Sequence, residues 1–287
     1  MTNNFKKVRR VLWIILLANI AVAILKIVIG SIIKSNSMTA DGLHSLTDGS
    51  SNIVGLIGIQ FASKPIDEDH PYGHGKFEML AGLFIAAMLF FIGVKVIINT
   101  AYKILNPVVP DISIESIVIL LFTLFINIIV SKYEYTKGIE YNSQILISDS
   151  MHTRSDIYVS SGVLVTLVCI KFGLPVIIDS IASFVVAGFI LHAAYEIFID
   201  NSGILVDKAV INTKEIENIV LSFEQVKDTH HIRSRGCGND LYIDMHIMTE
   251  PEMSVKKSHE LTHNIEERIK LEINRNAQVI AHLEPYN

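Results

Sequence analysis

The residues best suited to chemistry in this chain belong to an octet that occurs twice. Residues 41–48 read Asp-Gly-Leu-His-Ser-Leu-Thr-Asp, and residues 149–156 read Asp-Ser-Met-His-Thr-Arg-Ser-Asp. In each copy the histidine and the second aspartate are four residues apart, which gives the pairs His44 with Asp48 and His152 with Asp156. Side chains at this spacing share one face of a helix. Two facing copies would supply two nitrogens and two oxygens, a complete tetrahedral shell for zinc or a similar divalent ion.

The first aspartate of each octet has a different expected role. Four ligands already fill a tetrahedron, so Asp41 and Asp149 are expected to cap their helices or contact water rather than bind the metal. A single histidine or aspartate near a membrane surface is often just a satisfied contact between helices. The occurrence of two matching octets is what favours a metal site over that simpler interpretation.

The composition indicates a membrane protein with a soluble appendage. Of the 287 residues, 50% are apolar and 18% are charged, and the mean hydropathy is positive. Six membrane spans are expected, at residues 12–33, 38–62, 77–105, 112–130, 143–172 and 174–199. The second and fifth spans carry the octets, whose polar groups must face a bundle interior or a water-filled cavity.

The N-terminus has a basic flank, as a signal peptide does. Its apolar run is too long and lacks a small-residue cleavage site, so it is expected to be a retained first span. Basic residues gather at the N-terminus, in the loop 64–76 and in a charged turn at 132–137, while the turn 106–111 has none. With six spans, this distribution predicts that both termini are cytoplasmic. The compact layout favours a prokaryotic plasma membrane.

From about Leu205 the pattern is that of a soluble α+β domain. A helix is expected to begin near Asn212, which has Glu215 three residues on as in a capping box. Strands are expected at 229–233, 241–247 and 278–283, with a second helix at 254–273. The alternation around His246 places this histidine on the polar face of its strand. The predicted domains are therefore residues 1–204, a membrane bundle, and residues 205–287, a small α+β domain.

Two further groups of residues have the types that bind metals. One is a loop triad, Asp67, His70 and His74. The other is a dense set in the soluble domain: His230, His231, His246, His259, His263, His282 and Glu284. Taken alone, the loop triad is equally typical of a solvated loop, and the second group of scattered surface histidines.

Several other classes of protein are disfavoured. The net charge of −5 is small and no basic stripe occurs, which argues against a nucleic-acid partner. The two cysteines form no disulfide framework or cysteine-type zinc motif. A zinc enzyme is the main rival, but there is no His-Glu-x-x-His and no deaminase signature. A closed four-ligand shell also leaves no position for an activating water, so carriage is favoured over catalysis.

With these motifs, nearly the whole chain resembles the cation diffusion facilitator family, the proton-coupled zinc and iron efflux transporters. The resemblance implies six membrane helices, a cytoplasmic ferredoxin-like domain and a homodimer in the lipid bilayer. It places the transport site on the two His/Asp pairs and a second metal site on the loop triad. The His44 version of the motif resembles the zinc-favouring class.

The same resemblance implies residue roles in the soluble domain. It places a binuclear metal site there, with Glu284 standing where the well-studied pattern has aspartate, and with the remaining ligands at His230, His246, His259 and His282. It also implies that Lys76 and Asp207 form a charge pair at the dimer interface. The expected function is Zn²⁺ export in exchange for protons, with Cd²⁺, Fe²⁺, Co²⁺ and Mn²⁺ as further candidate substrates. The alternative is a membrane-anchored metal sensor or scaffold without transport.

Overall fold

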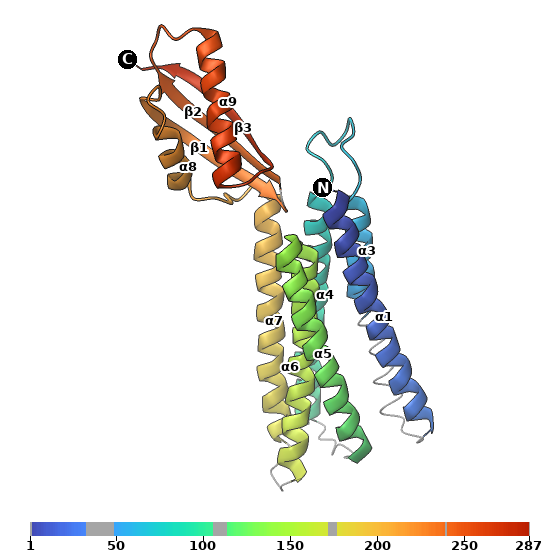
Figure 1. Cartoon of the computed structure of the whole chain (residues 1–287). Coiled ribbons are helices and arrows are strands. Elements are labelled where there is room, and N and C mark those ends of the chain that lie inside the picture. Colours follow the sequence, from blue (N-terminus) through green and yellow to red (C-terminus); the bar gives the residue numbers. More distant parts are fainter. Residues whose placement is uncertain (1, 33–48, 106–113, 172–176, 239, 287) are drawn as a thin grey trace. The chain divides into compact units, whose positions relative to one another are not determined.

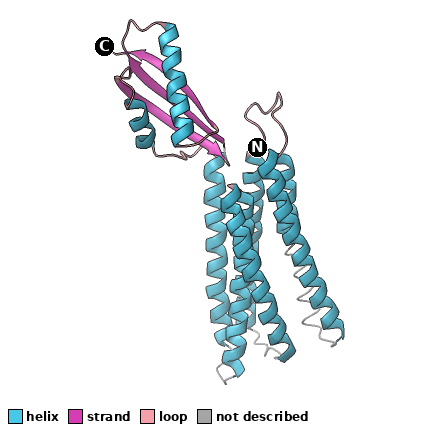
Figure 2. Cartoon of the chain, viewed as in Figure 1, coloured by secondary structure: helices cyan, strands magenta, loops and turns pink. Residues whose placement is uncertain are grey.

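The computed structural model describes residues 2–32, 49–105, 114–171, 177–238 and 240–286. Its contacts divide the chain into two compact units, Met1–Ser202 and Gly203–Asn287. The first unit is a bundle of helices (Figure 1). The second combines strands and helices (Figure 2).

The bundle contains six described helices. They are α1 (Thr2–Ile32), α3 (Ser50–Ala62), α4 (Lys76–Leu105), α5 (Ile114–Tyr141), α6 (Gln144–Lys171) and α7 (Ile177–Leu205). The N-terminus, the loop 63–75 and the connection between α5 and α6 lie at one end, which we call the loop end of the bundle (Figure 1). The three segments from which the orientation was predicted therefore lie at the same end, and the orientation itself stays a prediction.

Four of the described helices are long and apolar enough to cross a membrane. These segments are Asn4–Leu25, Lys76–Tyr102, Ile117–Tyr141 and Ser180–Leu205. Helix α6 has the length of a span but carries the polar second octet, and α3 is a shorter apolar helix. The expected second span, 38–62, begins outside the described residues, and its described part is α3. A transmembrane domain is thus confirmed, with four such helices in the described part of the chain.

The predicted end of the fourth span was wrong. A charged turn was expected at 132–137, but α5 continues as a helix to Tyr141. The charged residues of this stretch support the helix. Lys137 and Glu140 form an ion pair at 2.5 Å on its exposed side. Glu134 points the other way and is fully buried in the bundle.

The bundle buries aliphatic side chains along its axis and exposes others around its rim. Its largest buried side chains are Leu12, Ile15, Ile59, Met79, Ile85, Leu89, Ile145, Leu146, Ile190 and Ile197. The close packing of α3 on α4 depends on Gly58, where a Cβ atom would lie 2.4 Å from the Cβ of Ala81. Large apolar side chains such as Phe84, Phe91 and Phe125 are exposed on the outside. An apolar rim of this kind suits a lipid environment.

The start of α6 is capped by a side chain from another helix. The carboxylate of Glu78 on α4 accepts hydrogen bonds from the Ser143 hydroxyl and, at 3.1 Å, from the backbone amide of Ile145. Glu78 is buried, with 4% of its surface exposed. A carboxylate at this position satisfies amide groups that a helix N-terminus otherwise leaves unpaired and complements the helix dipole. Glu78 therefore fixes the position of the helix that carries the second octet.

Replacing Glu78 by alanine should destabilise the bundle. The Ile145 amide and the Ser143 hydroxyl would lose their buried acceptor, at a cost of about 1–2 kcal/mol. Thermal unfolding of the detergent-purified protein should show a lower midpoint for Glu78→Ala, and Glu140→Ala, an exposed glutamate at the same end, serves as the control. Equal midpoints for both variants and the wild type would show that the capping contact contributes nothing.

The second unit is a three-stranded sheet with two helices. Its elements are α8 (Thr213–Leu221), β1 (Asp228–Cys237), β2 (Asp240–Thr249), α9 (Val255–Glu272) and β3 (Ala277–Pro285). The sheet order is β1-β2-β3, with β1 antiparallel and β3 parallel to β2. The Asn212 side chain caps α8 by accepting from the Lys214 amide at 3.1 Å, as predicted. The expected order of helices and strands is confirmed.

One face of the sheet forms the core of this unit, and the other is polar. Both helices pack on the first face (Figure 2). The buried residues there are Ile216, Ile219 and Val220 from α8, Leu261, Ile265 and Ile269 from α9, and Leu241, Ile243, Met245 and Ile247 from β2. Because side chains alternate along a strand, His246 of β2 lies on the opposite, polar face, as predicted.

Candidate metal sites

The second octet forms a buried imidazole and carboxylate pair on α6. His152 is 2% exposed. Its Nδ1 atom lies 3.7 Å from Oδ2 of Asp156, one helical turn further along. The other ring nitrogen, Nε2, is buried without a hydrogen-bond partner among the described residues. The spacing therefore places the two side chains together, as predicted, with a nitrogen available for a further interaction.

The first octet, with Asp41, His44 and Asp48, lies outside the described residues. The chain that follows it is described, however, and it contacts α6. Asn52, four residues after Asp48, donates a hydrogen bond from its amide nitrogen to Asp149, the first residue of the second octet. The Oδ1 atom of Asn52 in turn accepts from Asn19 of α1 at 2.9 Å. Helices α3 and α6 are therefore neighbours.

Asp149 does not cap a helix, contrary to the prediction. Helix α6 begins five residues earlier, at Gln144, and its first turn is held by Glu78. Asp149 is consequently an interior residue of the helix, 1% exposed and bonded to Asn52. The predicted span 143–172 already places Asp149 inside its helix, which leaves no capping role for it. What the sequence does not show is that the Asn52 amide, from another helix, contacts this carboxylate in place of water.

The loop triad is assembled in the loop 63–75. Asp67 accepts from the His70 backbone amide at 2.8 Å, and its Oδ1 lies 3.0 Å from His70 Nδ1. Its other oxygen, Oδ2, lies 3.3 Å from His74 Nε2. Gly73 makes the turn possible, with a positive φ of 83°. One ligand atom from each residue lies within 4.8 Å of the others, a spacing suited to a shared cation.

The loop carboxylate is held in its ionised form. The hydrogen bond from His70 is the main cause that lowers the pKa of Asp67, and the charge of His74 lowers it further. A lowered pKa in the folded loop favours the folded loop at pH values above the unfolded pKa of this group. That contribution is lost as the pH falls through the lowered value.

Metal binding at the loop should therefore weaken as the pH falls. Because the pKa of Asp67 is lowered, the imidazole ligands and not this carboxylate should cause the loss. Imidazoles bind metal only when neutral, so acid should release the ion by protonating them. Asp67→Asn should weaken loop binding at neutral pH and leave the direction of its pH dependence unchanged. A Zn²⁺ titration of the full chain at several pH values measures both effects, with Asp69→Asn as the exposed control in the same loop. Equal affinity in Asp67→Asn and the control would remove Asp67 from the site.

A third group lies on the polar face of the sheet, where all three strands contribute. The Glu284 carboxylate of β3 joins two imidazoles. Its Oε1 lies 2.8 Å from His246 Nδ1, and its Oε2 lies 3.3 Å from His230 Nε2. The β-sheet register places His230 opposite His246 and His246 opposite His282. The His282 Nε2 atom lies 3.7 Å from Glu284 Oε1 at the edge of the group.

His231 lies close to this group of ligands, whereas His259 does not. His231 sits at a bulge in β1 with a positive φ of 50°, and its ring centroid lies 5.1 Å from that of His246. His259 is on α9, which packs on the other face of the sheet, and its ring pairs with His263 at 4.5 Å. Within one chain the structure therefore does not bring His259 to Glu284, because the core between α9 and the sheet separates them.

The charge pair predicted between Lys76 and Asp207 would join residues of different units. It stays a prediction. Lys76 begins α4 in the bundle. Asp207 follows α7, has a positive φ of 57°, and lies 3.5 Å from the Arg235 guanidinium of its own unit.

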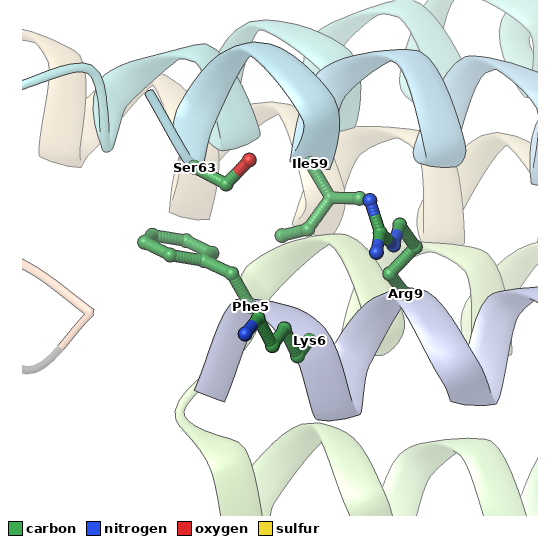
Figure 3. A pocket seen from close by; sticks show the side chains of 5 residues that line it. All are labelled: Phe5, Lys6, Arg9, Ile59 and Ser63. Carbon is green, nitrogen blue, oxygen red and sulfur yellow. The ribbon is translucent and has the colours of Figure 1, made fainter. Parts of the chain in front are cut away.

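A small pocket also opens between α1 and α3 (Figure 3). It is lined by Phe5, Lys6, Arg9, Ile59 and Ser63, and none of the predicted metal ligands is among them.

The bundle, its buried His/Asp pair and the histidine-rich sheet define a membrane protein that handles metal cations. Residues 12–206 match the cation efflux transmembrane domain, and residues 210–286 match the cytoplasmic domain of cation efflux proteins. The chain therefore belongs to the cation diffusion facilitator family, whose members are divalent metal cation efflux transporters.

Relatives from an archaeon, a bacterium and a plant agree with this assignment. An uncharacterized transporter of Methanocaldococcus jannaschii is 32% identical over 92% of this chain and 94% of its own length. The manganese efflux system protein MneP of Bacillus subtilis is 28% identical, with 97% and 96% covered. Metal tolerance protein C1 of Arabidopsis thaliana is 30% identical over 94% of this chain and 61% of its own length.

Proposed function

We propose that this chain is a proton-coupled antiporter that exports Zn²⁺ from the cytoplasm by alternating access. The observation that carries the proposal is the buried His152 and Asp156 pair on α6. The contact of Asn52 with Asp149 supports a position for His44 and Asp48 near this pair. The four side chains together would form the transport site.

The chemistry of these ligands explains the coupling to protons. A metal ion requires neutral imidazole and ionised carboxylate, so metal binding releases protons and protonation releases the metal. Histidine titrates near neutral pH in proteins generally, which suits His44 and His152 as the proton-binding partners. The aspartates compensate the charge of the ion in the bilayer.

Zinc is proposed as the main substrate because two imidazoles and two carboxylates match its tetrahedral preference. Relatives named as manganese efflux proteins make Mn²⁺ the principal competitor. Sites with nitrogen and oxygen ligands bind several first-row ions, so affinity alone separates them poorly. A competition flux assay with Zn²⁺, Mn²⁺, Cd²⁺, Fe²⁺ and Co²⁺ would rank them directly.

We further propose that the second unit is a cytoplasmic, homodimerising metal-binding domain. The match to a cytoplasmic domain of efflux proteins and the Glu284 group on the open face of the sheet support this role. His259, on the opposite side of the sheet core, would join such a site only if a second copy of the chain supplied it. The same geometry would let cytosolic metal tighten the dimer.

The experiment that tests the transport function is flux into sealed vesicles. Proteoliposomes with an acidic lumen should take up external Zn²⁺, and uptake should stop when an ionophore dissipates the pH gradient. The alternative function, a metal sensor or scaffold, is favoured by the half-buried histidine cluster of the sheet. It predicts metal binding to the purified protein with no flux at any pH gradient.

A further inference from the structure

Polar side chains from four helices meet inside the bundle beside the predicted transport pair. Glu134 of α5 is fully buried, and neither of its carboxylate oxygens has a hydrogen-bond partner among the described residues. Helices α5 and α6 touch at this level, where the Ser131 hydroxyl donates to the Ser150 carbonyl oxygen at 3.1 Å, and Asp149 of α6 interacts with Glu134. One Asp149 oxygen accepts from Asn52 of α3, which Asn19 of α1 orients, while Oδ1 has no partner in the described part of the chain. Three buried oxygens of these two neighbouring carboxyl groups therefore have no donor among the described residues.

Three basic side chains of the same two helices, those of Lys132, Lys137 and Arg154, do not pair with these carboxyl groups. Lys137 pairs with Glu140 at 2.5 Å. The Arg154 guanidinium lies 4.4 Å from the ring centroid of Tyr135. Lys132 is exposed. Two buried carboxyl groups that face each other are costly unless a cation or a proton compensates them.

The position of Glu134 and Asp149 along the bundle favours a cation over a proton as the compensating charge. Helices α5 and α6 form an antiparallel hairpin that turns at residues 142–143. Glu134 lies about 10 Å before this turn and Asp149 about 8 Å after it, at 1.5 Å of helix per residue. His152 is one turn further from the loop end than Asp149, and Asp156 two turns. A cation travelling from the loop end to His152 would pass the carboxylates first.

We propose that Glu134 and Asp149 form a second, oxygen-lined cation site in the bundle, between the loop end and the His152 and Asp156 pair. This inference rests on the proposed transport function. Carboxylate oxygens hold hard divalent cations such as Mn²⁺ or Mg²⁺ and leave them several waters. Such a site would receive the partly hydrated ion and pass it to the imidazole deeper in the bundle. Asn52 is a positioning residue, which fixes the Asp149 carboxylate by a hydrogen bond.

The test counts bound Mn²⁺ per full-length chain in detergent, from the loss of the electron paramagnetic resonance signal of free Mn²⁺. Glu134→Gln should bind one ion fewer than the wild type. Glu140→Gln removes the same charge from the exposed side of the same helix and should bind as many ions as the wild type. Asp149→Asn, which can still accept from Asn52, should reproduce the loss and keeps the test valid if Glu134→Gln fails to fold.

Transport gives the second readout. In proteoliposomes, Glu134→Gln should raise the half-saturating Mn²⁺ concentration about tenfold and change the maximal rate less, because it weakens capture of the ion. Unchanged Mn²⁺ counts in both Glu134→Gln and Asp149→Asn would overturn the proposal and indicate that the carboxyl groups share a proton. Asp156→Ala separates this outcome from a failure of the transport function. Retained flux in that variant would contradict the transport site whatever the Mn²⁺ count.

Discussion

Asp156→Ala should abolish Zn²⁺ uptake driven by a pH gradient, with a fall of at least about 100-fold in initial rate. Asp156 supplies the carboxylate beside His152, at 3.7 Å from the ring. Without it, a dication in the bundle would lose both a ligand and the charge that compensates it in a medium of low dielectric constant. The rate is measured in proteoliposomes that carry a zinc-sensitive dye in an acidic lumen.

A matched control for this variant exists on α7. His192 and Glu196 have the same spacing, and their atoms lie 3.4 Å apart, but both side chains are exposed. Glu196→Ala should therefore transport at the wild-type rate. Asp48→Ala should lose uptake as completely as Asp156→Ala. Wild-type flux in Asp156→Ala and Asp48→Ala would end the assignment of the octets to the transport site.

Glu284→Gln should lower the metal affinity of the second unit by about 10- to 100-fold. The two oxygens of this carboxylate contact two imidazoles, of His246 and His230, on neighbouring strands. A neutral amide keeps the shape but offers a weaker ligand and no charge. Affinity is measured by competition of the full chain with a chromophoric zinc chelator. Transport-site binding is removed in all samples by Asp156→Ala.

The control in the same unit is Glu250→Gln. Glu250 is exposed and pairs with Lys227 at 2.9 Å, away from the histidines. Its removal should leave the zinc affinity unchanged, and Glu284→Asp should retain most of it. Equal affinity in Glu284→Gln and the control would show that the histidine group on the sheet is not a metal site.

The features that local pattern determines were predictable from the sequence. The cap at Asn212 and the polar face of β2 follow from rules that act within a few residues. The loop triad also follows, since Asp67, His70 and His74 lie within one turn of the chain. The pairing of His152 with Asp156 required only the helical repeat.

The features that depend on packing between helices were not predictable. Charged residues around Glu134 suggested a turn, because the sequence does not show that Glu134 faces Asp149 across the α5 and α6 hairpin. The cap of α6 comes from Glu78, 65 residues earlier in the chain. His259 was grouped with Glu284 by resemblance to the family, whereas the sheet core separates them within one chain. In each case the partner is distant in sequence, and only the tertiary structure identifies it.

The most direct test of the central claim is an anomalous-scattering map at the zinc absorption edge from crystals of the zinc-loaded protein. The account predicts one peak in the bundle at about 2.0–2.2 Å from ligand atoms of all four octet side chains, His44, Asp48, His152 and Asp156. A bundle without a zinc peak, or a peak on His152 and Asp156 with His44 and Asp48 on a different surface, would contradict it.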